Sequence, residues 1–469
     1  MTACGEVTRT ETDSMGQVEV PADRYWGAQT QRALIHFSMR QEPILFEVVK
    51  AVAIVKKAAA VVNHDLGRLA GDKAALISRA AEEIMEGKLN GSFPLHAWTA
   101  GSGTHVNMNV NEVIANRAIE LAGGIKGSRE PIHPIDDVNM SQSTNDVFPT
   151  AMNIAAAHGI HEQLIPKVTK LRHALNEKVE RWTDIVKIGR THMQDAVPLT
   201  LGQEFSGYVG MLDDNLERIN RVLPELYRIA IGGTAVGTGL TAPVSFGERA
   251  ARQIADITGL PFVVAPNKFA VQGSHDSIVM TSSTLKTLAI SLYKIANDIR
   301  LLTSGPRTGL YELIIPCNEP GSSMMPGKVN PTQCEAMAMV AVQVMGYDAA
   351  VALAGGGGYL EMNVYKPLMI LNVIQSIRML SDACNNFTDF LVLGMEPNRT
   401  QIDLFLHRSL MLVTALTPMI GYDRAAHIVR LADGEGLTLK EAATRLGYLS
   451  DEEFDVLVDP YKMAYPSMM

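Results

Sequence analysis

The chain has 469 residues, of which 47% are hydrophobic and 19% charged, and its formal net charge is -9. This composition provides a large buried core, excludes a disordered chain and disfavours nucleic acid as the main partner. At roughly 150 residues per domain, the length predicts about three domains. The four cysteines lie far apart without a CxxC pair, which indicates neither a disulfide framework nor a zinc site and predicts a reducing, cytoplasmic compartment; they are Cys4, Cys317, Cys334 and Cys384.

Residues 1–140 are predicted to form a mixed, mostly helical domain. The first residues lack the apolar core of a signal peptide, and no uncharged apolar run reaches 18 residues, so we expect a soluble protein without a membrane partner. An extended segment opens 16–33, and apolar residues recur at helical spacing over 46–67 and 73–87. A polar stretch over 99–112 then leads into a helix predicted over 112–124.

Residues 141–396 are predicted to form a central long-helix bundle. The run 276–304 has neither proline nor glycine, and similar runs cover 200–223 and 368–393. The segment 334–355 is apolar nearly all round, and such a helix must be buried on every side. We therefore expect other subunits to complete the bundle, the alternative being a large monomeric core. Residues 397–469 are predicted to form a small helical domain, with S/T-x-x-E helix starts at 438–441 and 450–453.

Four polar clusters interrupt the apolar sequence, at 101–109, 141–146, 191–195 and 321–331. Singly, each is typical of turns and helix caps. Together they predict a site that binds a small polyanion through many hydrogen bonds, with neither a metal nor a cofactor. No HExxH motif or ligand cluster is present, and the glycines of 232–240 lack the spacing of a dinucleotide-binding loop, so we expect them to form a tight link after a bundle helix.

The last of these clusters, GSSMMPGKVNP (321–331), combines hydroxyls, a lysine and a side-chain amide in a loop rich in glycine and proline. It is not a phosphate-binding P-loop, because five residues separate Gly321 from Gly327 and valine follows Lys328. From its residues alone, an anion-binding loop and a plain surface connector are equally good interpretations.

The segment GSSMMPGKVNP resembles the signature loop of the fumarase/aspartase superfamily. The resemblance extends over nearly the whole chain, through VPADRYWGAQTQRA, GSGTHVNMNVNEVIANRA, SQSTNDVFPTAM, GRTHMQDAVPLTLGQE and SLMLVTALTPMIGYDRAA. MPGK followed by NPTQCEAM is similar to class II fumarases rather than aspartases. The resemblance implies a mainly α, three-domain fold whose bundles assemble into a 20-helix core in a homotetramer. It also implies reversible anti elimination of water from L-malate, a dicarboxylate, at cofactor-free sites shared among three subunits.

The resemblance also implies roles for individual residues. Ser322 would be the base, His192 would assist the leaving hydroxyl, and Glu335 would orient the histidine; from its position alone, Glu335 is equally an ordinary helix-terminal carboxylate. Substrate would be bound by Ser102, Gly103, Thr104, Ser143, Thr144, Asn145, Thr191, Ser323, Lys328, Val329 and Asn330. A secondary anion site would comprise His133, Pro134, Ile135 and Asp136.

Some positions depart from the family pattern. Ile135 stands where these fumarases usually have asparagine and offers no side-chain hydrogen bond, which weakens the expectation of a secondary anion site. Thr144 stands where they mostly have serine, and Thr241 where asparagine is common. Two alternatives remain open: an aspartate ammonia-lyase, and a non-catalytic helical relative such as the crystallins of this superfamily. Retention of Ser322 and Lys328 argues against the second.

Overall fold

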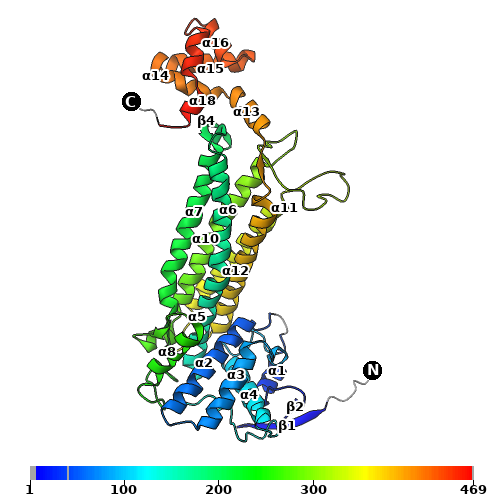
Figure 1. Cartoon of the computed structure of the whole chain (residues 1–469), viewed down its shortest axis with the longest axis vertical. Helices are drawn as coiled ribbons and strands as arrows, with labels where there is room; N and C mark the ends of the chain where they lie inside the picture. Colours follow the sequence, from blue (N-terminus) through cyan, green and yellow to red (C-terminus); the bar gives the residue numbers. More distant parts are fainter. Residues whose placement is uncertain (1–6, 40–41, 467–469) are drawn as a thin grey trace. The chain divides into compact units, whose positions relative to one another are not determined.

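A computed structural model of the chain describes residues 7–39 and 42–466 and shows a mainly helical protein (Figure 1). Cys4 lies outside the described residues. The chain divides into two compact units, each made of several chain segments. Unit 1 comprises Met1–Pro166, Glu217–Ala289 and Val342–Ser381; unit 2 comprises Lys167–Leu216, Ile290–Ala341 and Asp382–Met469. The boundary falls inside the long helices, so each of these helices contributes to both units.

The first part of unit 1 combines a hairpin with helices. Strands β1 (Thr8–Asp13) and β2 (Gly16–Pro21) pair antiparallel, Thr8 opposite Pro21. They are followed by α1 (Ala28–His36), α2 (Phe46–Asp65), α3 (Gly71–Met85), the 3₁₀ turn η1 (Asn90–Ser92) and α4 (Thr104–Leu121). The predictions for α2 and α3 are confirmed. Helix α4, however, begins eight residues before the predicted start, because its polar first turns find buried hydrogen-bond partners.

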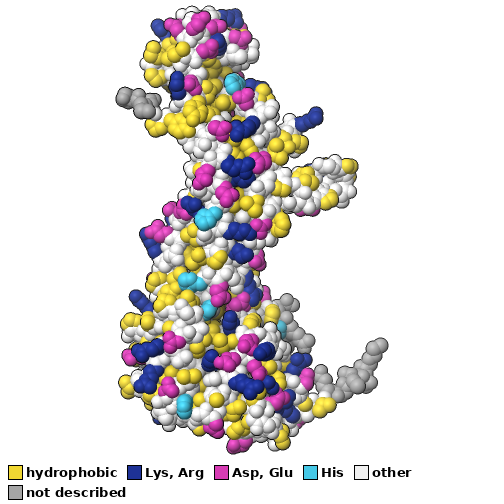
Figure 2. Space-filling model, viewed as in Figure 1, with side chains coloured by type: hydrophobic (Ala, Val, Ile, Leu, Met, Phe, Trp, Pro, Cys, Tyr) yellow, Lys and Arg dark blue, Asp and Glu magenta, His cyan; other side chains and the backbone are white. Residues whose placement is uncertain are grey.

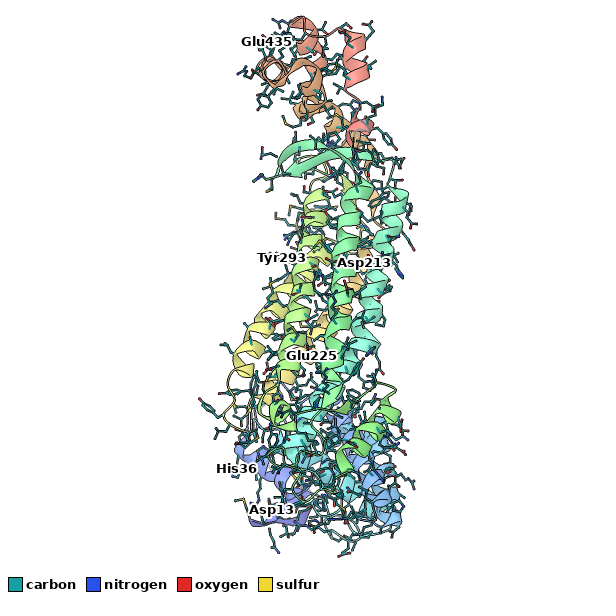
Figure 3. The ribbon with its side chains drawn as sticks, turned by 90° about the vertical axis from the view of Figure 1, so that its left-hand side faces the viewer. Asp13, His36, Asp213, Glu225, Tyr293 and Glu435 are labelled. Carbon is teal, nitrogen blue, oxygen red and sulfur yellow. The ribbon has the colours of Figure 1, made fainter. Side chains whose placement is uncertain are left out.

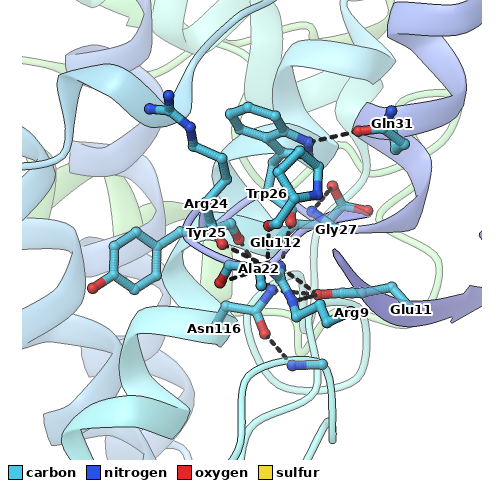
Figure 4. A network of polar contacts seen from close by, with 12 residues as sticks. Arg9, Glu11, Ala22, Arg24, Tyr25, Trp26, Gly27, Gln31, Glu112 and Asn116 are labelled. Atoms are coloured by element: carbon cyan, nitrogen blue, oxygen red, sulfur yellow. Dashed lines mark hydrogen bonds and ion pairs between the residues drawn. The ribbon is translucent and has the colours of Figure 1, made fainter. Parts of the chain in front are cut away.

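A buried carboxylate fixes the start of α1 (Figure 4). Helix α1 has no capping side chain of its own. Glu112 of α4 replaces one: it accepts hydrogen bonds from the backbone nitrogens of Gly27 (2.9 Å), Gln29 (2.7 Å) and Thr30 (3.2 Å), and from the Thr30 hydroxyl. These donors are the free amides of the first helical turn. Burial raises the pKa of Glu112 to about 7 while the donors oppose that rise.

Arg9 attaches the β1–β2 hairpin to the segment that follows it. Its guanidinium donates to the carbonyl oxygens of Pro21, Arg24 and Trp26, each at 2.7 Å, and to the Glu11 carboxylate. Glu11 in turn accepts from Asn116 Nδ2 of α4 at 2.8 Å. The N-terminal strands are thereby tied to α4, the helix on which the polar cluster 101–109 is carried.

The predicted long helices are present. They are α5 (Thr144–Gly159), continued through the π-turn η2 (Ile160–Leu164) into α6 (Ile165–Arg181), then α7 (Leu201–Leu226), α10 (Asp276–Leu302), α11 (Thr332–Gly355) and α12 (Lys366–Phe387), the last extended by the π-turn η3 (Thr388–Val392). Polar contacts join neighbouring helices. Arg172 pairs with Asp213 between α6 and α7 at 2.8 Å, and Asn215 Nδ2 donates to Ser291 Oγ between α7 and α10 at 2.9 Å.

The remaining elements are short. In unit 1, β5 (Arg228–Ile229) pairs parallel with β6 (Val263–Val264), beside α8 (Phe246–Thr258) and α9 (Lys268–Gly273). In unit 2, β3 (Val186–Thr191) and β4 (Gln194–Thr200) form an antiparallel hairpin, and β7 (Leu313–Ile314) pairs with β8 (Glu396–Pro397). The sequence analysis did not predict the β3–β4 hairpin, since Gly189 and the polar residues after it were interpreted as a loop.

The C-terminal segment has its own hydrophobic core. It contains α13 (Arg399–Arg408), the 3₁₀ helix η4 (Leu410–Leu416), α14 (Thr417–Ile420), α15 (Tyr422–Glu435), α16 (Leu439–Arg445), α17 (Asp451–Leu457) and α18 (Pro460–Met463). Leu416, Ile428 and Ala442 are fully buried within it. Both predicted capping boxes are confirmed, with Thr438 and Glu441 at the start of α16 and Ser450 and Glu453 at the start of α17.

Helix α11 leaves much of its apolar surface uncovered. By length and composition it could cross a membrane, yet only 28% of its most apolar window is buried. Met339, Val342 and Leu353 are 68%, 56% and 81% exposed. Figure 2 shows hydrophobic side chains reaching the drawn surface between charged ones. The single chain therefore leaves this apolar helix largely uncovered.

The capping role of Glu112 predicts a stability effect. Glu112→Gln places an amide NH₂ against backbone N–H donors, so the free energy of unfolding should fall by about 1–3 kcal/mol. Urea denaturation followed by circular dichroism measures it. Glu19→Gln is the matched control, because Glu19 is exposed and bonds to the hydroxyls of Thr10 and Thr8 rather than to helix amides. Equal stability of the two variants would contradict the role of Glu112.

Candidate active site

The cluster 101–109 begins with a glycine loop that packs against its neighbours without space for side chains. A Cβ on Gly101 would lie 1.5 Å from the Val364 carbonyl oxygen. Gly103 has φ +83°, and a Cβ there would lie 2.3 Å from the ring of Phe148. Only glycine satisfies both the left-handed conformation and this contact. The loop is thus held close to α5 and to the residues before α12.

This loop presents two hydroxyls at the start of α4. Ser102 Oγ and Thr104 Oγ1 lie 2.8 Å apart, and both side chains are partly exposed. The Thr104 backbone nitrogen donates to Ser102 Oγ at 3.3 Å. Since α4 begins at Thr104, free amides of its first turn lie beside these hydroxyls, an arrangement that favours an anionic ligand.

The cluster 141–146 forms the start of α5. Ser143 Oγ accepts from the Asn145 nitrogen at 3.2 Å, and Asp146 Oδ1 accepts from the Ser143 nitrogen at 2.9 Å, which completes a capping box. Asn145 Nδ2 donates to the Ala235 carbonyl oxygen at 2.8 Å. Thr144 is nearly buried, and its Oγ1 accepts from Asn107 Nδ2 of α4 at 3.0 Å. The structure therefore brings the first two predicted clusters into contact.

Asp146 also binds the glycine loop at 232–240. Its Oδ2 accepts from the backbone nitrogens of Gly232 at 3.0 Å and Thr234 at 2.9 Å. Burial raises the pKa of Asp146 to about 6, against the lowering effect of its amide donors and of Lys56. The sequence analysis missed this function of the glycine loop, which follows β5 rather than ending a helix directly. The capping motif S-x-x-D at 143–146 was the sequence signal that marked Asp146 as an acceptor of backbone amides.

The cluster 191–195 is the tip of the β3–β4 hairpin in unit 2. His192 and Met193 have φ of +55° and +61°, as in the type I′ turn of a two-residue hairpin, although neither is glycine. Holding two such residues in this region costs about 1–2 kcal/mol each, and strain of this kind concentrates at functional sites. Both side chains are exposed, as is Thr191, and Figure 3 shows the hairpin reaching to one side of the helices.

A buried charge cluster holds the base of this hairpin. Glu312 is 0% exposed and lies 3.0 Å from Lys187 Nζ and 2.7 Å from Arg190 Nη2. Lys187 is also paired with Glu204 of α7 at 2.7 Å. Buried charges of opposite sign need this close pairing to remain ionised. The cluster therefore fixes the strand that leads to His192.

The loop 321–331 is closed by its own hydrogen bonds. The Gly321 nitrogen donates to the Lys328 carbonyl oxygen at 2.9 Å, and Asn330 Nδ2 donates to the Gly321 carbonyl oxygen at 2.5 Å. Lys328 Nζ donates to Asn330 Oδ1 at 2.7 Å. The cation and the amide that were predicted to bind an anion therefore lie side by side, while Val329 between them is exposed.

Within this loop, Ser322 receives two backbone donors. Its Oγ accepts from the nitrogens of Met324 at 3.2 Å and Met325 at 3.0 Å. Two amides directed at one oxygen stabilise negative charge on it, as an anion-binding nest does. Ser323 is exposed and has no such donors in the described part of the chain. The two adjacent serines are thus in different environments.

Glu335, at the start of α11, lies 3.6 Å from Arg300 Nη2 of α10. Both side chains are partly exposed. Within the described residues its ion-pair partner is thus this arginine and not the histidine for which the sequence analysis proposed it. The expected role of Glu335 toward His192 stays a prediction.

The residues of the expected secondary anion site form a closed turn. His133 Nδ1 accepts from the nitrogens of Ile135 at 3.3 Å and Asp136 at 3.0 Å, so its donor capacity is on Nε2. Ile135 is 46% exposed. With His133 and Pro134 it lines a cavity of about 280 Å³ that also contains Glu11, Asp13 and Glu112. Arg129 also lines the cavity, and Glu11 and Asp13 are paired with Arg9 and Arg32, so the charge around it is mixed.

The structure thus assigns the four clusters to two groups. The clusters 101–109 and 141–146 lie in unit 1 and touch each other, while 191–195 and 321–331 lie in unit 2. Unit 1 supplies hydroxyls, amides and helix starts; unit 2 supplies an exposed imidazole, a lysine and a serine with two amide donors. These groups can bind a small anion, accept a carbon-bound proton and protonate a leaving group.

Comparisons with known proteins agree with this fold and these groups. A family model described as Lyase matches residues 16–346, and one described as Fumarase C C-terminus matches residues 412–465. The chain therefore falls in the lyase superfamily whose members share this helical bundle.

Individual relatives show to which family within this superfamily the chain belongs. "Fumarate hydratase class II" of Thermosynechococcus vestitus is 59% identical over 448 residues, 96% of each chain. "Fumarate hydratase, mitochondrial" of Rattus norvegicus is 55% identical over 460 residues, 98% of this chain and 90% of the other. The crystal structure of class II fumarase from Schistosoma mansoni aligns with a TM-score of 0.96 and 42% identity over 98% of this chain and 100% of the other. The chain belongs to the class II fumarate hydratase family.

The contact of Gly103 with Phe148 predicts a large effect of an added methyl group. Gly103→Ala should destabilise the protein by more than the roughly 1–2 kcal/mol that left-handed alanine costs, because the methyl also meets the ring. Thermal unfolding measures the difference. Gly123→Ala is the matched control: its φ is +79°, yet nothing lies within 4 Å of its added Cβ. Equal melting temperatures for both variants would refute the steric argument.

Proposed function

We propose that this enzyme interconverts L-malate and fumarate by anti elimination of water, with the groups of the four clusters in the roles derived below. The observation that carries the proposal is Ser322, whose Oγ accepts two backbone amides in the same loop that pairs Lys328 with Asn330. All the relatives named above are fumarate hydratases or fumarases, which favours water over ammonia as the leaving group.

The difficult step is removal of a carbon-bound proton beside a carboxylate. The electron pair left behind is delocalised into that carboxylate, which becomes a dianionic aci-carboxylate. We assign its stabilisation to Lys328 and Asn330, a cation and an amide held in one loop. Donors that are already oriented are more effective here than water, because they do not have to reorganise as the charge develops.

We assign the proton abstraction to Ser322. An alkoxide is a strong base but is rarely populated, and the amides of Met324 and Met325 stabilise its charge. The abstracted proton ends on Ser322 Oγ. The hydroxyl on the neighbouring carbon leaves as water, with a proton supplied through the His192 imidazole. Glu335 would orient this imidazole.

We assign the substrate's other polar groups to unit 1. Ser102, Thr104 and Ser143 offer hydroxyls, and Thr144 and Asn145 complete the set, with the backbone of Gly103. Thr191, Ser323 and Val329 would line the site from the hairpin and the loop. The elimination balances without an electron acceptor, and we propose that it proceeds without a cofactor. We keep the secondary anion site at His133, Pro134, Ile135 and Asp136 as a proposal, weakened because Ile135 offers no side-chain hydrogen bond.

We further propose that the active enzyme is a homotetramer with a 20-helix core and with each site shared among three subunits. The support is the uncovered apolar surface of α11, including Met339, Val342 and Leu353. Asp348 of the same helix is ion-paired with Lys286 of α10, and a helix of this kind suits a protein interface better than lipid. The three-part division at 140/141 and 396/397 would separate the site-bearing ends from the oligomerisation bundle.

We propose a reducing, cytoplasmic location. Cys317, Cys334 and Cys384 are free thiols in the described part of the chain, and burial raises the pKa of Cys334 and Cys384 to about 12. The relative from rat is named mitochondrial, so family membership by itself does not assign the compartment.

The two adjacent serines give a direct test of the mechanism. Ser322→Ala removes the base, so kcat for L-malate should fall about a thousandfold with an unchanged circular dichroism spectrum. Ser323→Ala removes only a binding hydroxyl and should raise KM about tenfold with kcat nearly unchanged. Fumarate absorbance measures both. Full turnover by the Ser322 variant would eliminate it as the base.

The tetramer is tested by charging the α11 surface. Met339→Asp combined with Val342→Asp places two carboxylates in an apolar contact, so analytical ultracentrifugation should detect smaller species that have lost malate activity. Val456→Asp is the control, since Val456 is 72% exposed on α17. A double variant that sediments as wild type and remains active would contradict the proposed interface.

A further inference from the structure

A buried lysine lies beneath the hydroxyls of unit 1 and has no part in the mechanism derived so far. Lys56, on α2, is 0% exposed. Its Nζ donates to Asn139 Oδ1 at 2.8 Å and to Gln142 Oε1 at 3.0 Å. A buried amine loses much hydration energy, and that loss needs compensation by hydrogen bonds. Both acceptors belong to the segment that leads into α5.

Backbone carbonyls fix the direction of these hydrogen bonds. Gln142 Nε2 donates to the oxygens of Val138 at 3.1 Å and Met140 at 3.0 Å, so Gln142 Oε1 must face the lysine. Asn139 Nδ2 faces the Gln142 carbonyl oxygen at 3.3 Å, so Asn139 Oδ1 also faces the lysine. An amide oxygen only accepts, and the lysine therefore donates to both.

The same oxygen of Asn139 sets the orientation of two further amides on α4. Asn107 Nδ2 donates to it at 3.2 Å and Asn111 Nδ2 at 3.1 Å. The second hydrogen of Asn107 Nδ2 points to Thr144 Oγ1 at 3.0 Å. The Thr144 oxygen is thus an acceptor toward Asn107, and no described residue accepts its hydroxyl hydrogen. That hydrogen is left for a ligand oxygen.

The orientation of the two asparagines lowers the stability of the fold, which points to a role in function. Asn107 and Asn111 are buried, and among the described residues their Oδ1 atoms have no hydrogen-bond partner. An unpaired buried carbonyl is destabilising, and apolar side chains would avoid that cost. The two asparagines are thus oriented so that their amide nitrogens donate, although this leaves their side-chain oxygens unpaired among the described residues.

We propose that Lys56 is a positioning residue for the malate–fumarate reaction, which through Asn139 and Asn107 holds the Thr144 hydroxyl as a donor toward a substrate carboxylate. The inference rests on the proposed function, in which Thr144 binds substrate. Burial lowers the pKa of Lys56 to about 7, and the nearby Asp146 carboxylate opposes that change. Either protonation state has at least two hydrogens, enough for the two acceptors.

The test compares steady-state kinetics of Lys56→Met, Thr144→Ala and the double variant in the full-length enzyme. Lys56→Met should raise KM for L-malate about ten- to a hundredfold and change kcat less than about threefold. Thr144→Ala should do the same. The double variant should be no worse than the poorer single variant, because both remove one hydrogen bond to substrate. Multiplicative effects would overturn the proposal.

A matched control separates positioning from stability. Lys178 is also buried and donates to two carbonyl oxygens, those of Leu393 at 3.1 Å and Met395 at 2.8 Å. Lys178→Met should lower the melting temperature and leave KM unchanged. A KM increase in Lys178→Met equal to that in Lys56→Met would mean that loss of any buried lysine suffices, and would refute the specific role.

If Lys56→Met does not fold, two substitutions of Asn139 test the positioning role of Lys56 instead. Asn139→Asp keeps an oxygen that accepts from the lysine and both asparagines but loses the hydrogen bond from Asn139 Nδ2 to the Gln142 carbonyl oxygen, so KM should rise less than in Asn139→Leu. Asn139→Leu removes the acceptor and should raise KM as Lys56→Met does. Equal KM values for the two would overturn the proposal.

The failures of the two proposals are distinguishable. A wild-type enzyme inactive on L-malate defeats the proposed function. Normal KM in Thr144→Ala defeats the assignment of that hydroxyl. Raised KM in Thr144→Ala with normal KM in Lys56→Met defeats only the role of the lysine.

Discussion

The buried carboxylate of Asp146 connects two backbone segments on which the unit 1 site depends. It accepts the amide of Ser143 at the start of α5 and those of Gly232 and Thr234 in the glycine loop. Desolvation raises its pKa to about 6, although the amides and Lys56 act in the opposite direction. The amides stabilise the charged form, so the folded segments and the ionised carboxylate depend on each other. The hydrogen bonds to Asp146 therefore also fix the hydroxyls at the start of α5.

The chemistry of this family creates negative charge on a substrate that is already anionic. In the proposed site, fixed dipoles would meet that demand: the first turn of α4, the amides at Ser322 and the hydroxyls of Ser102 and Thr104. The loop's cation, Lys328, is paired with the Asn330 amide. Oriented amides stabilise developing charge without the reorganisation that water requires. Strained backbone at His192 belongs to the same pattern, in which local stability is given up for geometry.

Sequence reasoning succeeded where periodicity and caps are local. The long helices α7, α10 and α12 and the capping boxes at Thr438 and Ser450 lie where the patterns predicted them. It failed where residues far apart in the sequence determine the local structure. Helix α4 starts at Thr104 because Asn107 and Asn111 find acceptors more than 25 residues away. The His192 hairpin was missed since its turn has no glycine. The role of Glu335 toward His192 stays a prediction, and in the described chain this carboxylate lies 3.6 Å from Arg300 Nη2.

The sequence by itself determined the helical class, the four polar clusters and the family, because these depend on composition, periodicity and motifs that are contiguous in the chain. Tertiary structure alone decided which clusters touch and which way each amide and hydroxyl points. Lys56 illustrates the difference: within an alanine-rich helix it reads as an ordinary charged residue, and only its burial beside Asn139 and Gln142 makes it a fixed donor. Hydrogen-bond direction depends on neighbours in space, and the linear order of residues carries no record of it.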